Sequence, residues 1–263
     1  MPDPVAHATP PSLTEHVMTS TPTTGIVQCS DSVQEAVESV FSALAVLEDA
    51  ARARLSAAGR RGWSLGTGDL ATLRPTIQTL LREQGERFNG TGVVMAPDAL
   101  ADAAFHLEWW QRSGEQGPRP LRLNLDPRSE SFYDYTRKPW FVIPRDEGHG
   151  TVMGPYVDLH CAGLYILTFT RPLTVDGEFV GVVGADVPVA AFEQIVVPSL
   201  KHLGGEAVVI TDEGRVLAAN TPTWAVGEIA RELLGRTAGI ERAAVRAPQV
   251  DWSVIRVQSS ATG

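Results

Sequence analysis

The chain has 263 residues, a length that predicts one large domain or two small domains that share an element. Its composition, with 43% hydrophobic and 20% charged residues and a mean hydropathy of −0.03, excludes a wholly disordered, collagen-like or membrane-spanning chain. The net charge of −9 argues against nucleic-acid binding and against docking on an anionic membrane, because both need clustered lysine and arginine.

The N-terminal segment is poor in apolar periodicity and holds no lysine or arginine, so we expect a disordered tail over residues 1–30. It lacks the basic and apolar regions of a secretory signal. No apolar window reaches the length of about 18 residues that a transmembrane helix needs. We therefore expect a cytoplasmic protein with no membrane partner.

A helical period follows the tail. Ser32–Glu35 match a capping box, and apolar residues recur at helical spacing as far as Ala58. We therefore predict a long N-terminal helix within residues 31–60, which could serve as a spine or as the seam of a homodimer. A second, weaker helix is predicted over residues 69–83.

The pattern then changes to strands. The clearest is a hairpin, in which the apolar runs Leu164–Arg171 and Phe179–Val187 are joined by a turn with Asp176-Gly177 at its tip. The other expected elements are strands over 91–96, 105–112 and 121–125, an ordered loop with one helical turn over 126–155, a helix over 188–200, a hairpin over 207–219, a helix over 224–234, and a strand over 250–257 that returns to the second hairpin.

Hairpins with helices at the ends indicate an α+β architecture, in which antiparallel sheets are backed by helices. We expect the long helix to be followed by a larger ligand-binding module over residues 61–200 and a smaller second module over residues 201–263.

No motif for nucleotide phosphates, zinc proteolysis or a nucleophile elbow is present. The two cysteines, Cys29 and Cys161, cannot form a disulfide framework. His149 and His160 lack a third ligand at metal-binding spacing. We therefore predict no catalytic residue, no metal and no cofactor.

Aromatic and charged side chains are concentrated between Tyr133 and Asp186. A zwitterionic ligand needs donors for its carboxylate and acceptors for its ammonium group. Lys138 and the Trp140 indole N–H could supply the first, and Asp158 and Asp186 the second. Asp186 is the most informative of them, because it follows an apolar strand, where an unpaired carboxylate would cost several kcal/mol.

Further aromatic side chains could complete the walls of this pocket. One of the adjacent residues Trp109 and Trp110 is expected to line it while the other packs behind. The predicted ligand-binding set is Tyr133, Lys138, Trp140, Phe141, Tyr156, Asp158, Asp186 and Trp110.

The run from residue 130 to 195 resembles the double-Cache family, the PAS-like small-molecule sensor domains of bacterial chemoreceptors and sensor kinases. Two positions depart from the motif of its amino-acid-binding branch: Lys138 stands where that branch has arginine, and Phe141 where it has tyrosine. Lysine lacks the two-pronged guanidinium that arginine offers a carboxylate. The residues that carry the resemblance are Tyr133, Trp140, Tyr156, Asp158 and Asp186.

The resemblance implies a PAS-like Cache fold and a non-catalytic sensor. We expect a small amine-containing ligand, an amino acid or a related amine, and a signal passed to a soluble regulatory protein or through a homodimer along Ser32–Ala58. Two alternatives stay open. One is a small-carboxylate binder, in which Arg137 and Lys138 dominate; the other is an enzyme on a PAS-like scaffold that uses Asp158 and His160.

Overall fold

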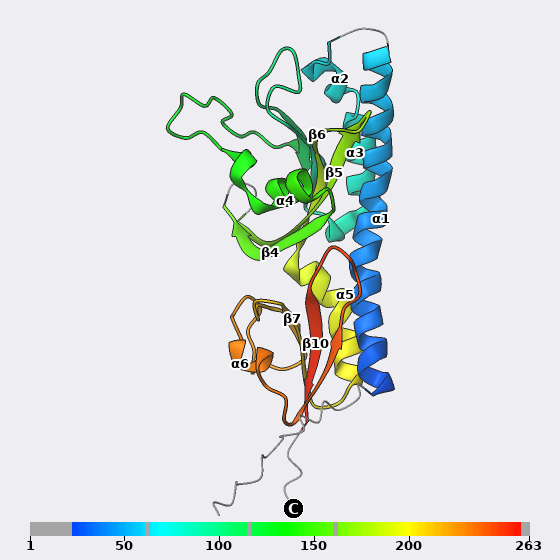
Figure 1. The fold of residues 1–263 in the computed structure, drawn as a ribbon, viewed down its shortest axis with the longest axis vertical. Helices are drawn as coiled ribbons and strands as arrows, with labels where there is room; N and C mark the ends of the chain where they lie inside the picture. The colour runs from blue at the N-terminus through cyan, green and yellow to red at the C-terminus, as the bar shows by residue number, and fades with distance from the viewer. Residues whose placement is uncertain (1–22, 61–63, 115–116, 160–162, 259–263) are drawn as a thin grey trace, which may run out of the picture.

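Two antiparallel sheets lie end to end along one long helix (Figure 1). This computed structural model describes residues 23–60, 64–114, 117–159 and 163–258. Its helices are α1 (Thr24–Arg60), α2 (Thr67–Ala71), α3 (Arg74–Gln84), α4 (Pro139–Glu147), α5 (Val189–His202) and α6 (Arg231–Leu234). Its strands are β1 (Gly90–Met95), β2 (Leu107–Gln111), β3 (Arg119–Pro120), β4 (Thr151–Asp158), β5 (Leu164–Val175), β6 (Glu178–Pro188), β7 (Glu206–Thr211), β8 (Val216–Ala219), β9 (Ile240–Ala244) and β10 (Trp252–Val257).

Helix α1 begins at Thr24 rather than at residue 31. Ile26 and Cys29 are buried and extend the apolar stripe of the helix toward its N-terminus at the same three-to-four-residue spacing. The predicted tail is therefore wrong from Thr24 onward, and residues 1–22 lie outside the described part of the chain.

The apolar stripe of α1 is buried within the chain itself. Leu44 and Leu47 are fully buried, and the helix contacts β5 and β6 of the large sheet, α5, and β9 and β10 of the small sheet. Val46, on the opposite face, is 59% exposed. The stripe predicted as a homodimer seam over Ser32–Ala58 is thus occupied by the chain's own core, and the homodimer stays a prediction. No helix among the described residues is long and apolar enough to cross a membrane.

The large sheet has the strand order β3-β2-β1-β6-β5-β4. The predicted hairpin is confirmed as β5 and β6, with Asp176 and Gly177 at its tip in the left-handed region, as a type I′ turn requires. Along β6 successive side chains point to opposite faces, so that Val183 packs toward the core beneath α1 while Asp186 lies on the other face. This second face carries the candidate site.

The predicted loop over residues 126–155 instead contains α4 and most of β4. Pro139 lies in the first turn of α4, where the N–H that proline lacks would have no helical partner. Phe141 is fully buried and fixes this helix on the sheet. The predicted strand over 121–125 is not present, and only Arg119–Pro120 pairs with β2.

Two predicted helices also differ. The one over 69–83 is divided into α2 and α3 by a turn at Thr72, and Pro75 lies in the first turn of α3. The one over 224–234 is reduced to α6, because Trp224 packs into the core of the small sheet from an irregular segment. Strand β9 was not predicted.

The small sheet has the order β8-β7-β10-β9. The predicted second hairpin and its returning strand are confirmed, since β7 pairs with both β8 and β10. Helix α5, predicted over 188–200, joins the sheets, and its Phe192 contacts Trp252 of β10 edge to face at 5.7 Å between ring centroids. The α+β fold is therefore as predicted, and the predicted division at residue 200 falls inside α5.

Candidate functional site

The floor of the site is built from aligned positions of four strands. Trp109 of β2 pairs with Gly92 of β1, which pairs with Gly184 of β6, and Gly184 pairs with Thr170 of β5. Residues directly opposite one another in an antiparallel sheet share a face. A Cβ atom on Gly184 would lie 3.3 Å from Cη2 of Trp109. The glycines thus leave room for the indole to lie across the sheet.

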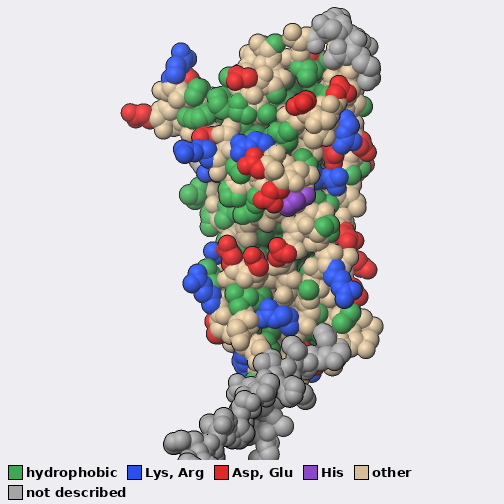
Figure 2. Space-filling view, in the orientation of Figure 1, with side chains coloured by type: hydrophobic (Ala, Val, Ile, Leu, Met, Phe, Trp, Pro, Cys, Tyr) green, Lys and Arg blue, Asp and Glu red, His purple; other side chains and the backbone are tan. Residues whose placement is uncertain are grey.

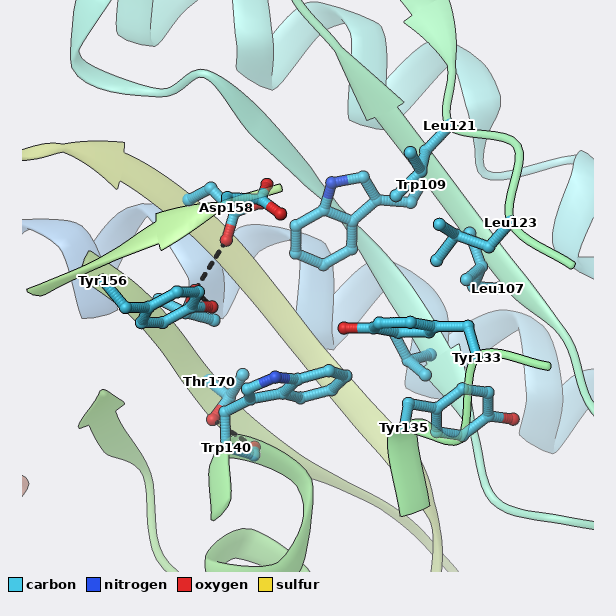
Figure 3. Close-up of a pocket in the computed structure, with 13 residues that line it drawn as sticks. Leu107, Trp109, Leu121, Leu123, Tyr133, Tyr135, Trp140, Tyr156, Asp158 and Thr170 are labelled. Atoms are coloured by element: carbon cyan, nitrogen blue, oxygen red, sulfur yellow. Dashed lines mark hydrogen bonds between the residues drawn. The ribbon is translucent and has the colours of Figure 1, made fainter. Parts of the chain in front are cut away.

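A cavity opens above this floor, with a volume of about 50 Å³ counted over the positions open to the centre of a water molecule. One water needs about 10–15 Å³ on this measure, so the cavity has room for a small organic ligand. Figure 3 shows Trp109 and Trp140 on opposite sides of it, with Tyr156 and Asp158 at one end and Tyr133 at the other. Its lining, called here the inner chamber, is Val94, Leu107, Trp109, Leu121, Leu123, Tyr133, Tyr135, Trp140, Tyr156, Asp158, Thr168, Thr170 and Asp186.

Asp186 is the deepest charged residue of the inner chamber and is 5% exposed. The Thr168 hydroxyl donates to its Oδ1 at 2.8 Å, and the oxygens of Thr168 and Tyr156 are 2.5 Å apart. Because the single Thr168 hydrogen points to Asp186, the Tyr156 hydroxyl donates to Thr168. The three groups form one hydrogen-bonded chain that ends on the carboxylate.

Burial raises the pKa of Asp186 to about 7, partly offset by the Thr168 hydrogen bond and reinforced by the nearby Asp158 carboxylate. Burial, followed by the charge of Asp186, also raises the pKa of Tyr156. Asp186 forms no ion pair with any described residue. A negative charge on Asp186 therefore has no balancing cation among the described residues.

The aromatic walls are fixed by hydrogen bonds to the backbone. The Thr170 hydroxyl donates to the carbonyl oxygen of Trp140 at 2.7 Å, and the Tyr135 hydroxyl donates to the carbonyl oxygen of Met95 at 2.8 Å. Nε1 of Trp109 is buried and has no hydrogen-bond partner in the described structure. The chamber thus offers ring faces and two carboxylates, while the Trp109 indole N–H is buried against Gly90 of the sheet.

Five of the eight predicted binding residues meet in the inner chamber. They come from the segment before α4 and from α4, β4 and β6, and the sheet brings them together across a long stretch of chain. These five are Tyr133, Trp140, Tyr156, Asp158 and Asp186.

Trp110 does not line the inner chamber, because its neighbour Trp109 does so. Adjacent residues of a strand point to opposite faces. The Trp110 Nε1 atom donates to Oε1 of Glu108 at 2.7 Å on the far face of β2, and that carboxylate also binds Arg74. The binding role predicted for Trp110 is therefore not supported by its position.

Phe141 and Lys138 also lie elsewhere. Phe141 packs beneath the chamber, with its ring 5.3 Å from that of Tyr135. Lys138 is exposed, and its Nζ lies 5.5 Å from the centre of the Tyr133 ring, outside the inner chamber. Consecutive residues of a helix point about 100° apart, so Trp140 and Phe141 cannot both face the cavity.

Several lining residues were not singled out in the sequence, among them Thr168 and Thr170. The sequence pattern could have identified both, since they are polar residues at alternate positions of a mostly apolar strand and therefore share one face of the sheet. His160 and Cys161 lie outside the described residues. His149 is exposed and bonds to Glu147 rather than facing the chamber.

Residues 83–194 match the family model described as the first PDC sensor domain of methyl-accepting chemotaxis protein-like proteins. This range holds all of the inner chamber.

Solved structures share the fold over most of the chain. The ligand-binding domain of the Pseudomonas aeruginosa amino acid chemoreceptor PctC, in complex with GABA, is 19% identical with a TM-score of 0.58, covering 88% of this chain and 96% of that one. The domain of the Pseudomonas fluorescens chemoreceptor CtaA, in complex with L-serine, is 18% identical with a TM-score of 0.57, covering 88% and 92%. The extracellular domain of a protein assigned as a histidine kinase is 15% identical with a TM-score of 0.60, covering 88% and 95%.

The matched family is a sensor domain, and the PctC and CtaA structures are ligand-binding domains of chemoreceptors rather than enzymes. The chain thus has the α+β fold of chemoreceptor ligand-binding domains, and its residues 83–194 match a PDC sensor domain.

Proposed function

We propose that the chain is a sensor domain of the double-Cache type, and that its inner chamber binds the ammonium group of a small amine, an amino acid or a related compound. The observation that carries this proposal is Asp186, a buried carboxylate that faces a cavity and has no ion-pair partner in the described structure. A bound ammonium group would supply the missing charge.

The aromatic lining supports the same ligand. Trp109, Trp140, Tyr133 and Tyr156 present a cage of rings in which an organic cation is attracted by the negative faces of the rings. Among the described residues, the lining holds no lysine, arginine or histidine. A purely anionic ligand would meet two carboxylates there and no cation from the described residues, which weighs against the small-carboxylate alternative.

The relatives support the ligand class in a general way. The PctC and CtaA structures contain GABA and L-serine, and both compounds carry an ammonium group. The histidine kinase domain is extracellular, whereas we expect this chain to be cytoplasmic. The cytoplasmic location stays a prediction.

We also propose that the signal leaves the site through α1. Strand β5 contributes Thr168 and Thr170 to the chamber, while Arg171 of the same strand donates from Nε to Oε2 of the buried Glu48 on α1 at 2.5 Å. A ligand can shift such a contact only if it binds one arrangement more tightly than the other.

A ligand screen on the full chain tests the proposed function. Pentylamine, 2-aminopentanoate and 5-aminopentanoate carry an ammonium group, whereas pentanoate and pentanol have the same carbon chain without one. At about a hundredfold excess over its dissociation constant, a bound amine should stabilise the protein by about 2.7 kcal/mol, measured as a rise in Tm. Stabilisation by pentanoate or pentanol and by none of the amines would contradict the proposal.

The adjacent tryptophans provide a matched pair of variants. Trp109→Leu removes a ring face from the chamber and should lower the affinity for pentylamine about tenfold. Trp110→Leu removes a ring of the same size from the other face of β2 and should leave the affinity unchanged. Calorimetric titration of both variants measures the difference, and equal losses would show that the chamber is not where the amine binds.

A further inference from the structure

One hydroxyl group, that of Thr168, connects the polar residues at the deep end of the inner chamber. Thr168 of β5 lies directly opposite Asp186 of β6 in the sheet, and its hydroxyl donates to Oδ1 of that carboxylate at 2.8 Å. The Thr168 oxygen also lies 2.5 Å from the hydroxyl oxygen of Tyr156 on β4. Thr168 is 4% exposed, so it links the polar groups of β4 and β6 from within the protein.

The hydrogens of these three groups can point in only one direction while Asp186 is ionised. A carboxylate has no hydrogen to donate, so the single Thr168 hydrogen goes to Oδ1. The Thr168 oxygen can then only accept, and the Tyr156 hydroxyl donates to it. The Tyr156 oxygen keeps its lone pairs for a ligand. The deep end of the chamber therefore presents acceptors and no hydrogen from this chain.

The second carboxylate oxygen of Asp186 is open to the cavity. Oδ2 accepts no hydrogen bond from a described residue, yet it is not one of the fully buried polar atoms that lack a partner. It therefore has access to the inner chamber, which Asp186 lines. The bond from Thr168 to Oδ1 holds the plane of the carboxylate, so that Oδ2 is the oxygen available to an ammonium group.

Few ionisable groups face Asp186 inside the chamber. Strand β4 supplies Asp158 and Tyr156, and the segment before α4 supplies Tyr133. Tyr135 also lines the chamber, but its hydroxyl donates to a backbone carbonyl oxygen. The lining residues of β1, β2, β5 and α4 carry no ionisable group. None of the described lining residues is a cation, so only hydrogen bonding favours the charged form of Asp186.

The hydrogen bond from Thr168 supports the ionisation of Asp186 near neutral pH. Burial raises the pKa of Asp186 to about 7, the Thr168 hydrogen bond opposes that rise, and the Asp158 carboxylate adds to it. Acidic side chains at the surface, such as those across the middle of the face shown in Figure 2, are in contact with solvent and need no such support. Without the Thr168 hydroxyl, Asp186 would be mostly protonated at neutral pH.

We propose that Thr168 is a positioning residue that sets the pH range in which the inner chamber binds an amine. It acts through Asp186 and Tyr156, by holding the carboxylate and by directing the tyrosine hydrogen away from the ligand. The proposal rests on the proposed function, because it concerns the control of the charge that holds the ammonium group.

Thr168→Val tests this role, because valine keeps the shape of the side chain and removes the hydroxyl. The full chain is titrated calorimetrically with pentylamine between about pH 5 and pH 9, where the amine stays protonated because an alkylammonium group has a pKa near about 10.4, as in lysine. The quantity compared is the midpoint, the pH at which the association constant is half of its value at high pH.

The midpoint should rise in Thr168→Val by about one pH unit, because a hydrogen bond to a charged group is worth at least about one pKa unit. The affinity should therefore fall roughly fivefold at about pH 7 and largely recover at about pH 9. Thr168→Ala removes the same hydroxyl and leaves a small cavity. It should give the same midpoint, so the test does not depend on the folding of one variant.

Two further variants separate this role from a loss of packing. Thr168→Ser restores a hydroxyl and should return the midpoint close to that of the unmodified protein. Thr91→Val is the matched control, because the fully buried Thr91 lies on the other face of the same sheet and its hydroxyl donates to the Gly184 carbonyl oxygen at 2.7 Å. It should leave both the midpoint and the affinity unchanged.

Two failures are distinguishable. If pentylamine binding is lost in Asp186→Asn, but Thr168→Val and Thr168→Ala leave the midpoint in place or weaken binding equally at every pH, Thr168 does not set the pH range. A midpoint that serine shifts as far as valine does has the same meaning. If pentylamine binding survives Asp186→Asn, or no amine binds, the proposed function fails and the role of Thr168 with it.

Discussion

Asp186→Asn should lower the affinity for pentylamine by at least a hundredfold. The substitution keeps the size of the side chain and an oxygen that can accept from Thr168, but it removes the charge that faces the ammonium group. Loss of one member of a buried charge pair costs about 3–5 kcal/mol, which corresponds to more than two orders of magnitude in affinity. Calorimetric titration of the variant measures this loss.

The matched control is Asp251→Asn, which neutralises an exposed aspartate in the turn before β10, far along the chain from the chamber. It should bind pentylamine as the unmodified protein does. A change of less than about threefold on Asp186→Asn would mean that the ammonium group is held elsewhere.

The affinity for amines should fall as the pH is lowered. Burial raises the pKa of Asp186 to about 7 in the unliganded protein, and only the ionised carboxylate attracts an ammonium group. Above about pH 7 the affinity should be constant, and below it the affinity should fall about tenfold per pH unit, or roughly a hundredfold between about pH 8 and pH 5. Titration of pentylamine across this range measures the slope.

The same ionisation should affect the stability of the unliganded protein with the opposite sign. An aspartate in the unfolded chain ionises near pH 3.9, so between about pH 4 and pH 7 the folded state holds the extra proton and is destabilised as the pH rises. Three pKa units correspond to about 4 kcal/mol as an upper bound. Asp186→Asn should remove this contribution, and a pH dependence of affinity that persists in the variant would assign the titration to another group.

Asp186 could be predicted from the sequence because a charge at the end of an apolar run is conspicuous wherever the strand lies. The choice between Trp109 and Trp110 could not be made in the same way. Adjacent residues of a strand face opposite sides of the sheet, but because both are tryptophans the sequence does not show which of them faces the chamber. The pairing of Trp109 with Gly92 of β1 determines which side of the sheet each tryptophan faces, and this pairing is a contact between two strands that local sequence does not specify. Strand glycines such as Gly90 and Gly92 were the available signal, since they mark a close approach.

Helix α4 shows why the predicted loop was wrong. Pro139 and Pro144 lie in or beside its short sequence and disfavour a helix on local grounds. The helix forms because Phe141 packs among aromatic rings supplied by distant parts of the chain, including Phe179 at 5.6 Å between centroids. The misplacement of Lys138 and Phe141 has the same origin, because their directions depend on where this helix begins.

Strand β5 separates the inner chamber from α1, the helix that spans both sheets, and neighbouring residues of the strand face the two sides. Thr170 touches the ligand space, and the next residue, Arg171, holds the buried Glu48 of α1. No intervening layer of side chains can absorb a small displacement of the strand, and an ion pair that is mostly buried has few alternative geometries. The chamber and the Arg171–Glu48 contact of α1 are therefore separated by one peptide unit of β5, so the proposed signal would need no side chain between them to relay it.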